Sequence, residues 1–118
     1  DLALYTSESE SFCLSILEAA FFGCPSVATK VGGIPEVVED GVTGLLIDFG
    51  DADGLARAIE KMIVDVPLRQ KLGNAAKFEA QKKFTANVII PRYESLYYNL
   101  LKSPQRNFLE SLDHPINC

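Results

Sequence analysis

The sequence contains no tryptophan, a single histidine and only three cysteines, Cys13, Cys24 and Cys118. Three cysteines are an odd and sparse set without the paired spacing of metal ligands, so they favour reduced thiols over a disulfide framework. The lone His114 lies near the end of the chain, in a stretch without helical periodicity. We therefore expect no metal site and no catalytic histidine.

Basic residues are in the minority, with 11 Lys and Arg against 16 Asp and Glu and a formal net charge of −5. A nucleic-acid partner would need a basic face, so the charge balance argues against one. Apolar runs long enough to span a membrane are also missing, and residues 1–20 lack the basic start and hydrophobic stretch of a signal peptide. We expect a chain without a transmembrane segment that works in the cytoplasm, at most at the inner face of a membrane.

The chain does contain enough apolar residues for one packed domain, since 47% of its 118 residues are hydrophobic and 23% are charged. Short apolar runs typical of buried strands occur at residues 2–5, 26–29 and 45–47. Helical spacing occurs over residues 12–22 and 52–63, and Asp51 is a candidate N-cap for the second of these helices. Strands that alternate with helices predict an α/β fold with a Rossmann-like parallel sheet and flanking helices.

The later part of the chain has the pattern of helices alone. We expect a short helix over residues 67–72 that ends at Gly73, then another over residues 74–83 with Phe78 packed inward. A last long helix follows, in which apolar residues form a stripe. Pro91 lies inside that stripe, so it should delay the start of the helix or kink it.

The helix predicted over residues 12–22 has an unusual pattern. Almost every residue in it is apolar, and Glu18 is its only charge. Ser11, Ser15 and Glu18 recur at helical spacing, and Glu10 lies just before the helix start. A helix N-terminus offers unpaired N–H groups to a phosphate, and a carboxylate further along the same face can accept two hydroxyl hydrogen bonds. The pattern suits a sugar nucleotide, although a core-covering helix that shows water one polar stripe has the same spacing.

Gly32 and Gly33 follow the second predicted strand. Two consecutive glycines permit positive φ angles and close backbone approach, and Pro35 is well placed to begin a short helix. A loop at the carboxyl end of a strand is where open α/β sheets bind ligands. A simple tight turn would also explain the pair.

Several motifs together resemble one known family. Glu10 and Glu18, separated by seven residues, resemble the E-x7-E signature of retaining glycosyltransferases of the GT4 family. Residues 27–36 resemble its V-A-T-x-x-G-G-I-P-E run, and residues 40–46 its D-G-x-T-G-L-L run. The resemblance covers about residues 1–101. It implies the GT-B fold, in which two Rossmann-like domains enclose the active site, and makes this chain the later part of the C-terminal, donor-binding domain.

The resemblance also implies roles for individual residues. Glu10 would be catalytic and lie at the donor sugar, whereas Glu18 would hold the ribose hydroxyls. The other donor-binding positions that it implies are Phe12, Cys13, Leu14, Ser15, Gly32 and Gly33. The implied reaction is sugar transfer with retention of anomeric configuration from a UDP-sugar or related nucleotide-sugar, with no metal and no other cofactor.

Two positions depart from the family. Cys13 stands where the family commonly has glycine, and Ser15 where it often has valine. If the sugar needs close backbone approach there, the Cβ and sulfur of Cys13 would narrow the pocket and alter or abolish donor binding.

We expect residues 1–102 to supply donor binding and residues 103–118 to be a C-terminal tail. The acceptor-binding N-terminal GT-B domain and the first strands of the donor domain would lie in other segments, so the chain alone should show no turnover. The alternative to a transferase segment is a non-catalytic nucleotide-binding or subunit-pairing module of the same fold, which would bind UDP without discriminating the attached sugar. A scaffold that binds nothing is the third hypothesis.

Overall fold

The structure, a computed structural model, describes residues 1–102, so the predicted tail and His114 lie outside the described residues. Contacts divide the chain into two compact units, residues 1–85 and residues 86–118. The first unit contains three strands and four helices, and the second contains one described helix.

Three parallel strands form the sheet of the first unit. These are β1 (Ala3–Tyr5), β2 (Ser26–Thr29) and β3 (Gly44–Ile47), in the order β1-β2-β3. The central strand β2 is buried throughout, whereas β1 pairs with β2 on one side only among the described residues. The sheet confirms the predicted α/β class, and each strand lies within one residue of its predicted position.

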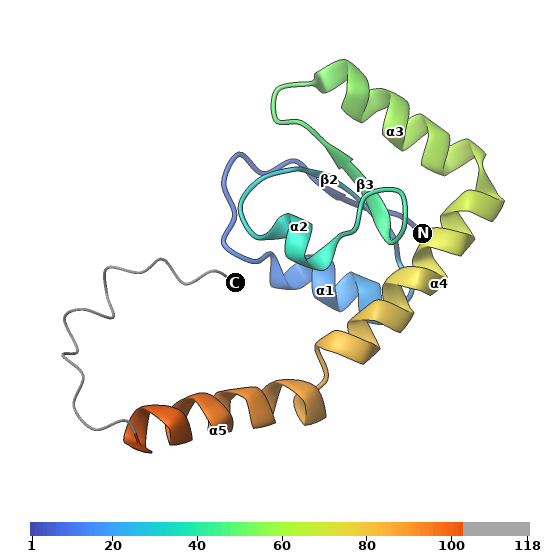
Figure 1. Cartoon of the computed structure of the whole chain (residues 1–118). Coiled ribbons are helices and arrows are strands. Elements are labelled where there is room, and N and C mark those ends of the chain that lie inside the picture. The colour runs from blue at the N-terminus through green and yellow to red at the C-terminus, as the bar shows by residue number, and fades with distance from the viewer. Residues whose placement is uncertain (103–118) are drawn as a thin grey trace. The chain divides into compact units, whose positions relative to one another are not determined.

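Helices cover both faces of this sheet (Figure 1). On one face, α1 (Leu14–Phe21) and α2 (Ile34–Val37) enclose a cluster that includes Ala28 of β2. On the other, α3 (Ala52–Val64) packs its buried Met62 against Val27. The alternation of Val27 and Ala28 follows from the two-residue period of a strand, which sends successive side chains to opposite faces. The apolar run of β2 is therefore explained by burial on both faces.

Aspartates begin the two longer helices of this unit. The Asp51 carboxylate accepts a hydrogen bond from the N–H of Gly54 at 2.8 Å, which confirms the predicted N-cap of α3. Asp65 caps α4 (Val66–Lys83) in the same way, accepting from the N–H of Leu68 at 2.9 Å.

The prediction that Gly73 ends a helix was wrong. Helix α4 continues through it, and a Cβ at Gly73 would overlap the carbonyl oxygen of Gly23. Glycine is needed there because α4 passes close to the turn after α1. Phe78 was also predicted wrongly, since its side chain is 63% exposed, and the small side chains of Ala76 and Ala80 make the buried contacts instead.

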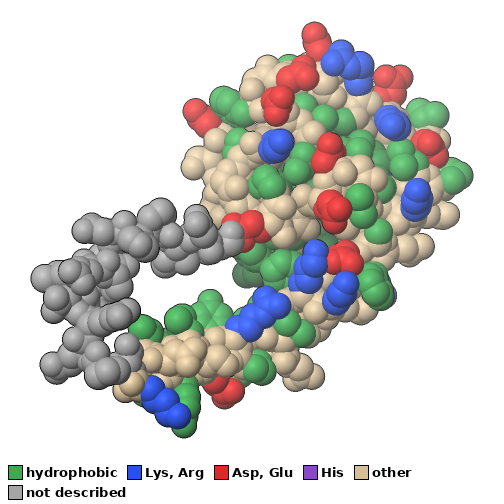
Figure 2. All heavy atoms as spheres, in the orientation of Figure 1, with side chains coloured by type: hydrophobic (Ala, Val, Ile, Leu, Met, Phe, Trp, Pro, Cys, Tyr) green, Lys and Arg blue, Asp and Glu red, His purple; other side chains and the backbone are tan. Residues whose placement is uncertain are grey.

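The second unit contributes α5 (Ala86–Lys102), which begins without delay and continues through Pro91. None of its residues is buried, and Figure 2 shows hydrophobic side chains on its surface. The exposed large apolar residues of α5 are Ile90, Tyr93, Leu96, Tyr97, Tyr98, Leu100 and Leu101. Across residues 1–102, none of the helices combines the length and the hydrophobicity that a membrane crossing requires.

Candidate functional site

The candidate site is organised by the segment of residues 6–13, which links β1 to α1 and is called the Glu10 loop below. Helix α1 begins at Leu14, two residues later than predicted, because Cys13 has φ 61° and ψ 68°. This left-handed conformation cannot belong to a right-handed helix. Within residues 1–102, Cys13 is the only residue other than glycine with a positive φ. No side chain caps α1, so its first N–H groups remain available to a ligand.

The side chain of Cys13 lies in the core. It is 7% exposed and packs in a cluster with Ile16, Ala28 and Ile34, while its Sγ lies 3.6 Å from Oγ of Ser15. The sulfur thus packs among core residues, and the expectation that it would narrow a ligand pocket stays a prediction. The left-handed backbone offers a physical reason for the glycine that the resemblance implies at this position, because only glycine adopts left-handed angles without strain.

The two glutamates of the motif lie on separate elements. Glu10 is half-buried in the loop, and its Oε1 accepts a hydrogen bond from the N–H of Ser11 at 3.2 Å. Glu18 lies in the second turn of α1, where its side chain is exposed, as are those of Ser11 and Ser15. The predicted polar stripe is confirmed, although it shares this face with Leu14, which is 61% exposed.

Hydrogen bonds join the Glu10 loop to the end of β2 and to the segment that follows it. The N–H of Gly33 donates to the carbonyl oxygen of Glu10 at 3.3 Å, and Oγ1 of the buried Thr29 donates to the carbonyl oxygen of Ser7 at 2.6 Å. The two sequence motifs that carry most of the predicted site residues are thus in direct contact. Sequence reasoning placed both motifs near the donor but did not predict this contact.

Two aromatic residues that sequence reasoning did not assign also hold this region. The hydroxyl of Tyr5, at the end of β1, donates to the carbonyl oxygen of Ser15 at 2.9 Å. Burial raises the pKa of this phenol above its ordinary value. Phe84, just after α4, meets the ring of Phe12 edge-on at 5.7 Å. The aromatic character of these positions was the only sequence signal.

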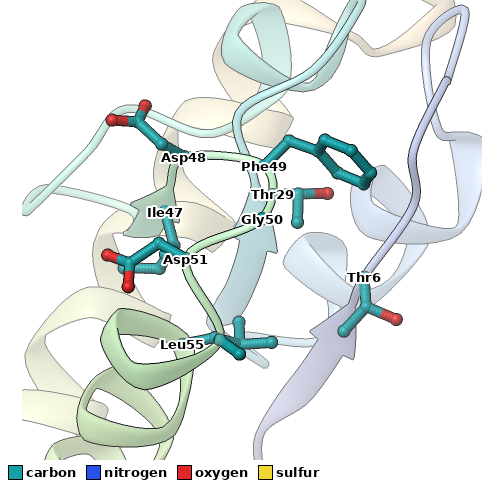
Figure 3. Close-up of a pocket in the computed structure, with 9 residues that line it drawn as sticks. Thr6, Thr29, Ile47, Asp48, Phe49, Gly50, Asp51 and Leu55 are labelled. Atoms are coloured by element: carbon teal, nitrogen blue, oxygen red, sulfur yellow. The ribbon is translucent and has the colours of Figure 1, made fainter.

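A separate cavity of about 160 Å³ lies at the carboxyl ends of the strands (Figure 3). Thr6 and Thr29 contribute from the ends of β1 and β2, and Phe49 from the loop after β3. The carboxylates of Asp48 and Asp51 point away from the two threonines. Sequence reasoning missed this cavity, and its only local signal was the Asp-Phe-Gly-Asp run after a strand. Within residues 1–102, no three His, Cys, Asp or Glu side chains gather so that they could hold a metal ion.

A family-level match agrees with this arrangement. The description of the family is "Glycosyl transferases group 1", and the match covers residues 1–78. The chain belongs to this glycosyltransferase family.

Its curated relatives include the N-acetyl-alpha-D-glucosaminyl L-malate synthase of Bacillus anthracis, 40% identical over 86% of this chain and 27% of the relative. A phosphatidylinositol N-acetylglucosaminyltransferase component of Arabidopsis thaliana is 36% identical over 98% of this chain and 25% of the relative. The chain therefore spans about a quarter of the length of the curated relatives it matches.

Solved structures agree with the fold. A sucrose-phosphate synthase from Thermosynechococcus elongatus superposes with a TM-score of 0.79 at 32% identity, covering 85% of this chain and 25% of the other. HepE from Anabaena in complex with UDP-glucose superposes with a TM-score of 0.75 at 34% identity, covering 83% and 28%. These neighbours are GT-B glycosyltransferases, which confirms the predicted fold class.

Proposed function

We propose that this chain supplies the donor-binding part of a retaining glycosyltransferase of the GT4 type whose donor is a UDP-sugar. The observation that carries the proposal is the uncapped N-terminus of α1, with Glu10 before it and the exposed Glu18 along its outer face. Free N–H groups and the positive end of the helix dipole favour a diphosphate at this position. The likeness to HepE, solved with UDP-glucose, supports a nucleotide-sugar as the ligand.

The roles follow the chemistry of each group. The N–H groups at the start of α1, from Cys13 to Ser15, bind the diphosphate and the sugar. The Glu18 carboxylate accepts hydrogen bonds from the two ribose hydroxyls, and the Glu10 carboxylate acts at the donor sugar. Transfer then needs no metal ion from this segment, because helix N–H groups stabilise the charge on the leaving diphosphate.

The names of two relatives guide the choice of donor. Both the malate synthase and the phosphatidylinositol enzyme are named for an N-acetylglucosaminyl group. UDP-N-acetylglucosamine is therefore the first donor to test. The acceptor would be bound by the parts of the polypeptide that correspond to the remaining length of the relatives, and we place the reaction in the cytoplasm.

The proposal is tested by amide NMR of this chain with and without UDP-N-acetylglucosamine. We expect shifts concentrated at residues 12–18 and 32–33 that disappear in Glu18→Ala. The control is Glu60→Ala, which removes an exposed glutamate from α3 on the other face of the sheet and should leave the shifts unchanged. The absence of any shift with millimolar UDP-N-acetylglucosamine, UDP-glucose or UDP would contradict donor binding by this chain.

The alternative of a non-catalytic nucleotide-binding module depended on the change from glycine to Cys13. Because the Cys13 side chain is buried in the core, it gives no reason to expect a lost sugar site. The transferase proposal is therefore the one that the geometry favours.

A further inference from the structure

Gly32 and Gly33 lie against the backbone of the Glu10 loop. A Cβ at Gly32 would overlap the carbonyl oxygen of Glu10, and a Cβ at Gly33 would overlap that of Ser11. Both neighbours are backbone atoms, which cannot rotate aside as the end of a flexible side chain can. Any larger residue at these positions must therefore displace the loop.

The two glycines are required for different reasons. Gly32 has φ 51°, so a side chain there would be strained as well as obstructed. Gly33 has φ −83°, which any residue adopts, so the obstruction at Gly33 is purely steric. Gly33 is also buried and donates its N–H to Glu10. Replacement of Gly33 by alanine therefore tests the contact with the loop without adding backbone strain at Gly33.

Ile34, the residue after the two glycines, also supports the Glu10 loop. Ile34 is fully buried and packs in the cluster that contains the side chain of Cys13, the last residue of the Glu10 loop. The loop is thus held at two points from the same segment, through its backbone at Glu10 and Ser11 and through its buried thiol at Cys13.

We propose that Gly32 and Gly33 are positioning residues that fix the Glu10 carboxylate and the first N–H groups of α1 in their donor-binding arrangement. They act by allowing the backbone of the Glu10 loop to come close, not by touching the donor. This inference rests on the proposed function for its consequence in binding, but the contact between the two segments is independent of any ligand.

The test begins with Gly33→Ala in the intact chain and uses Cys13 as a reporter of the loop. Alkylation by iodoacetamide is followed peptide by peptide, so that Cys13 and Cys24 are read separately. Because displacement of the loop uncovers a thiol that is otherwise buried, we expect Cys13 to be labelled about tenfold faster or more, with Cys24 unchanged. The dissociation constant for UDP-N-acetylglucosamine should rise about tenfold in the same variant.

Two glycine variants serve as matched controls. Gly73→Ala also drives a Cβ into a backbone carbonyl, that of Gly23, so it should be destabilising without moving the Glu10 loop. Gly41→Ala shares the positive φ of Gly32, at 72°, but its Cβ would meet nothing within 4 Å. Both controls should keep the wild-type labelling rate at Cys13 and the wild-type donor affinity.

If Gly33→Ala does not fold, Ile34→Val replaces it. This variant removes one buried methyl group beneath Cys13 and typically lowers stability only modestly. We expect faster Cys13 labelling and weaker donor binding, whereas Ile59→Val, an equal deletion on the α3 face, should change neither.

The outcomes separate the two proposals. Unchanged Cys13 labelling in a folded Gly33→Ala protein would overturn the inference, as would faster labelling with unchanged donor affinity. A wild-type protein that binds no UDP-sugar would instead contradict the proposed function. In that case faster labelling of Cys13 would still show that the glycines hold the loop.

Discussion

Cys13 allows a sharp test of backbone strain, because Cys24 is a second cysteine of the same unit without a left-handed backbone. We consider alanine and glycine replacements at both positions. Alanine removes only the sulfur and keeps the backbone restricted. Glycine removes the Cβ as well and frees the backbone, so the comparison of the two variants at each site isolates the effect of φ.

The expected magnitudes follow from the geometry. At an ordinary site, loss of the Cβ removes about 0.8 kcal/mol of burial, and the extra freedom of glycine in the unfolded chain costs about 0.4–1 kcal/mol. Glycine should therefore be less stable than alanine by about 1.2–1.8 kcal/mol at Cys24. At Cys13, relief of the left-handed strain returns about 1–2 kcal/mol. The two Cys13 variants should consequently differ by about 0.8 kcal/mol at most, in either direction.

The assay is urea unfolding of the 118-residue chain. The midpoint urea concentrations of the variants are compared, with the dependence of the unfolding free energy on urea concentration unchanged. The expected result is a clear gap between alanine and glycine at Cys24 and a smaller one, of either sign, at Cys13. An equal gap at both sites would refute the reasoning, because it would mean that the left-handed conformation of Cys13 stores no strain.

Three further predictions concern caps and aromatic contacts. Asp51→Ala removes the acceptor for the N–H of Gly54 and should lower the free energy of unfolding by about 1 kcal/mol in a urea melt; an unchanged midpoint would contradict it. Because burial raises the pKa of Tyr5, its contribution to stability is present below about pH 10 and is lost as pH rises further. Tyr5→Phe should therefore lose less stability than wild type between pH 9 and 11, and parallel losses would argue against this. Phe84→Leu deletes the edge-on contact with Phe12 and should destabilise by about 0.5–1.5 kcal/mol, which thermal unfolding would measure; an unaltered melting temperature would exclude a stabilising role.

The elements defined by local patterns were predictable from the sequence. The three strands needed only short apolar runs, and the N-cap of α3 needed only Asp51 before a helical pattern. Gly73 was misinterpreted because a glycine that ends a helix and one that permits close packing look alike in sequence. The difference depends on the carbonyl of Gly23, fifty residues earlier, which α4 approaches only in the folded chain.

In the candidate site, too, local patterns predicted some features, whereas others depend on contacts that form only in the folded chain. The resemblance assigned Glu10, Glu18 and the glycine pair to the candidate site, which stays a prediction, and the helical spacing predicted the exposed stripe on α1. Neither could show that Gly33 meets the loop of Glu10, because that contact joins segments more than twenty residues apart. The left-handed backbone of Cys13 was also not predicted, because the glycine that the resemblance implies there was interpreted as close approach to the sugar and cysteine itself carries no preference for these angles.

The one-sided pairing of β1 has a practical consequence for handling the isolated chain. Among the described residues, the outer edge of β1 presents backbone N–H and C=O groups without strand partners, and Leu4 beside them is 49% exposed. Such an edge is a template for strands of other molecules. Concentrated solutions of the isolated chain should therefore self-associate edge to edge.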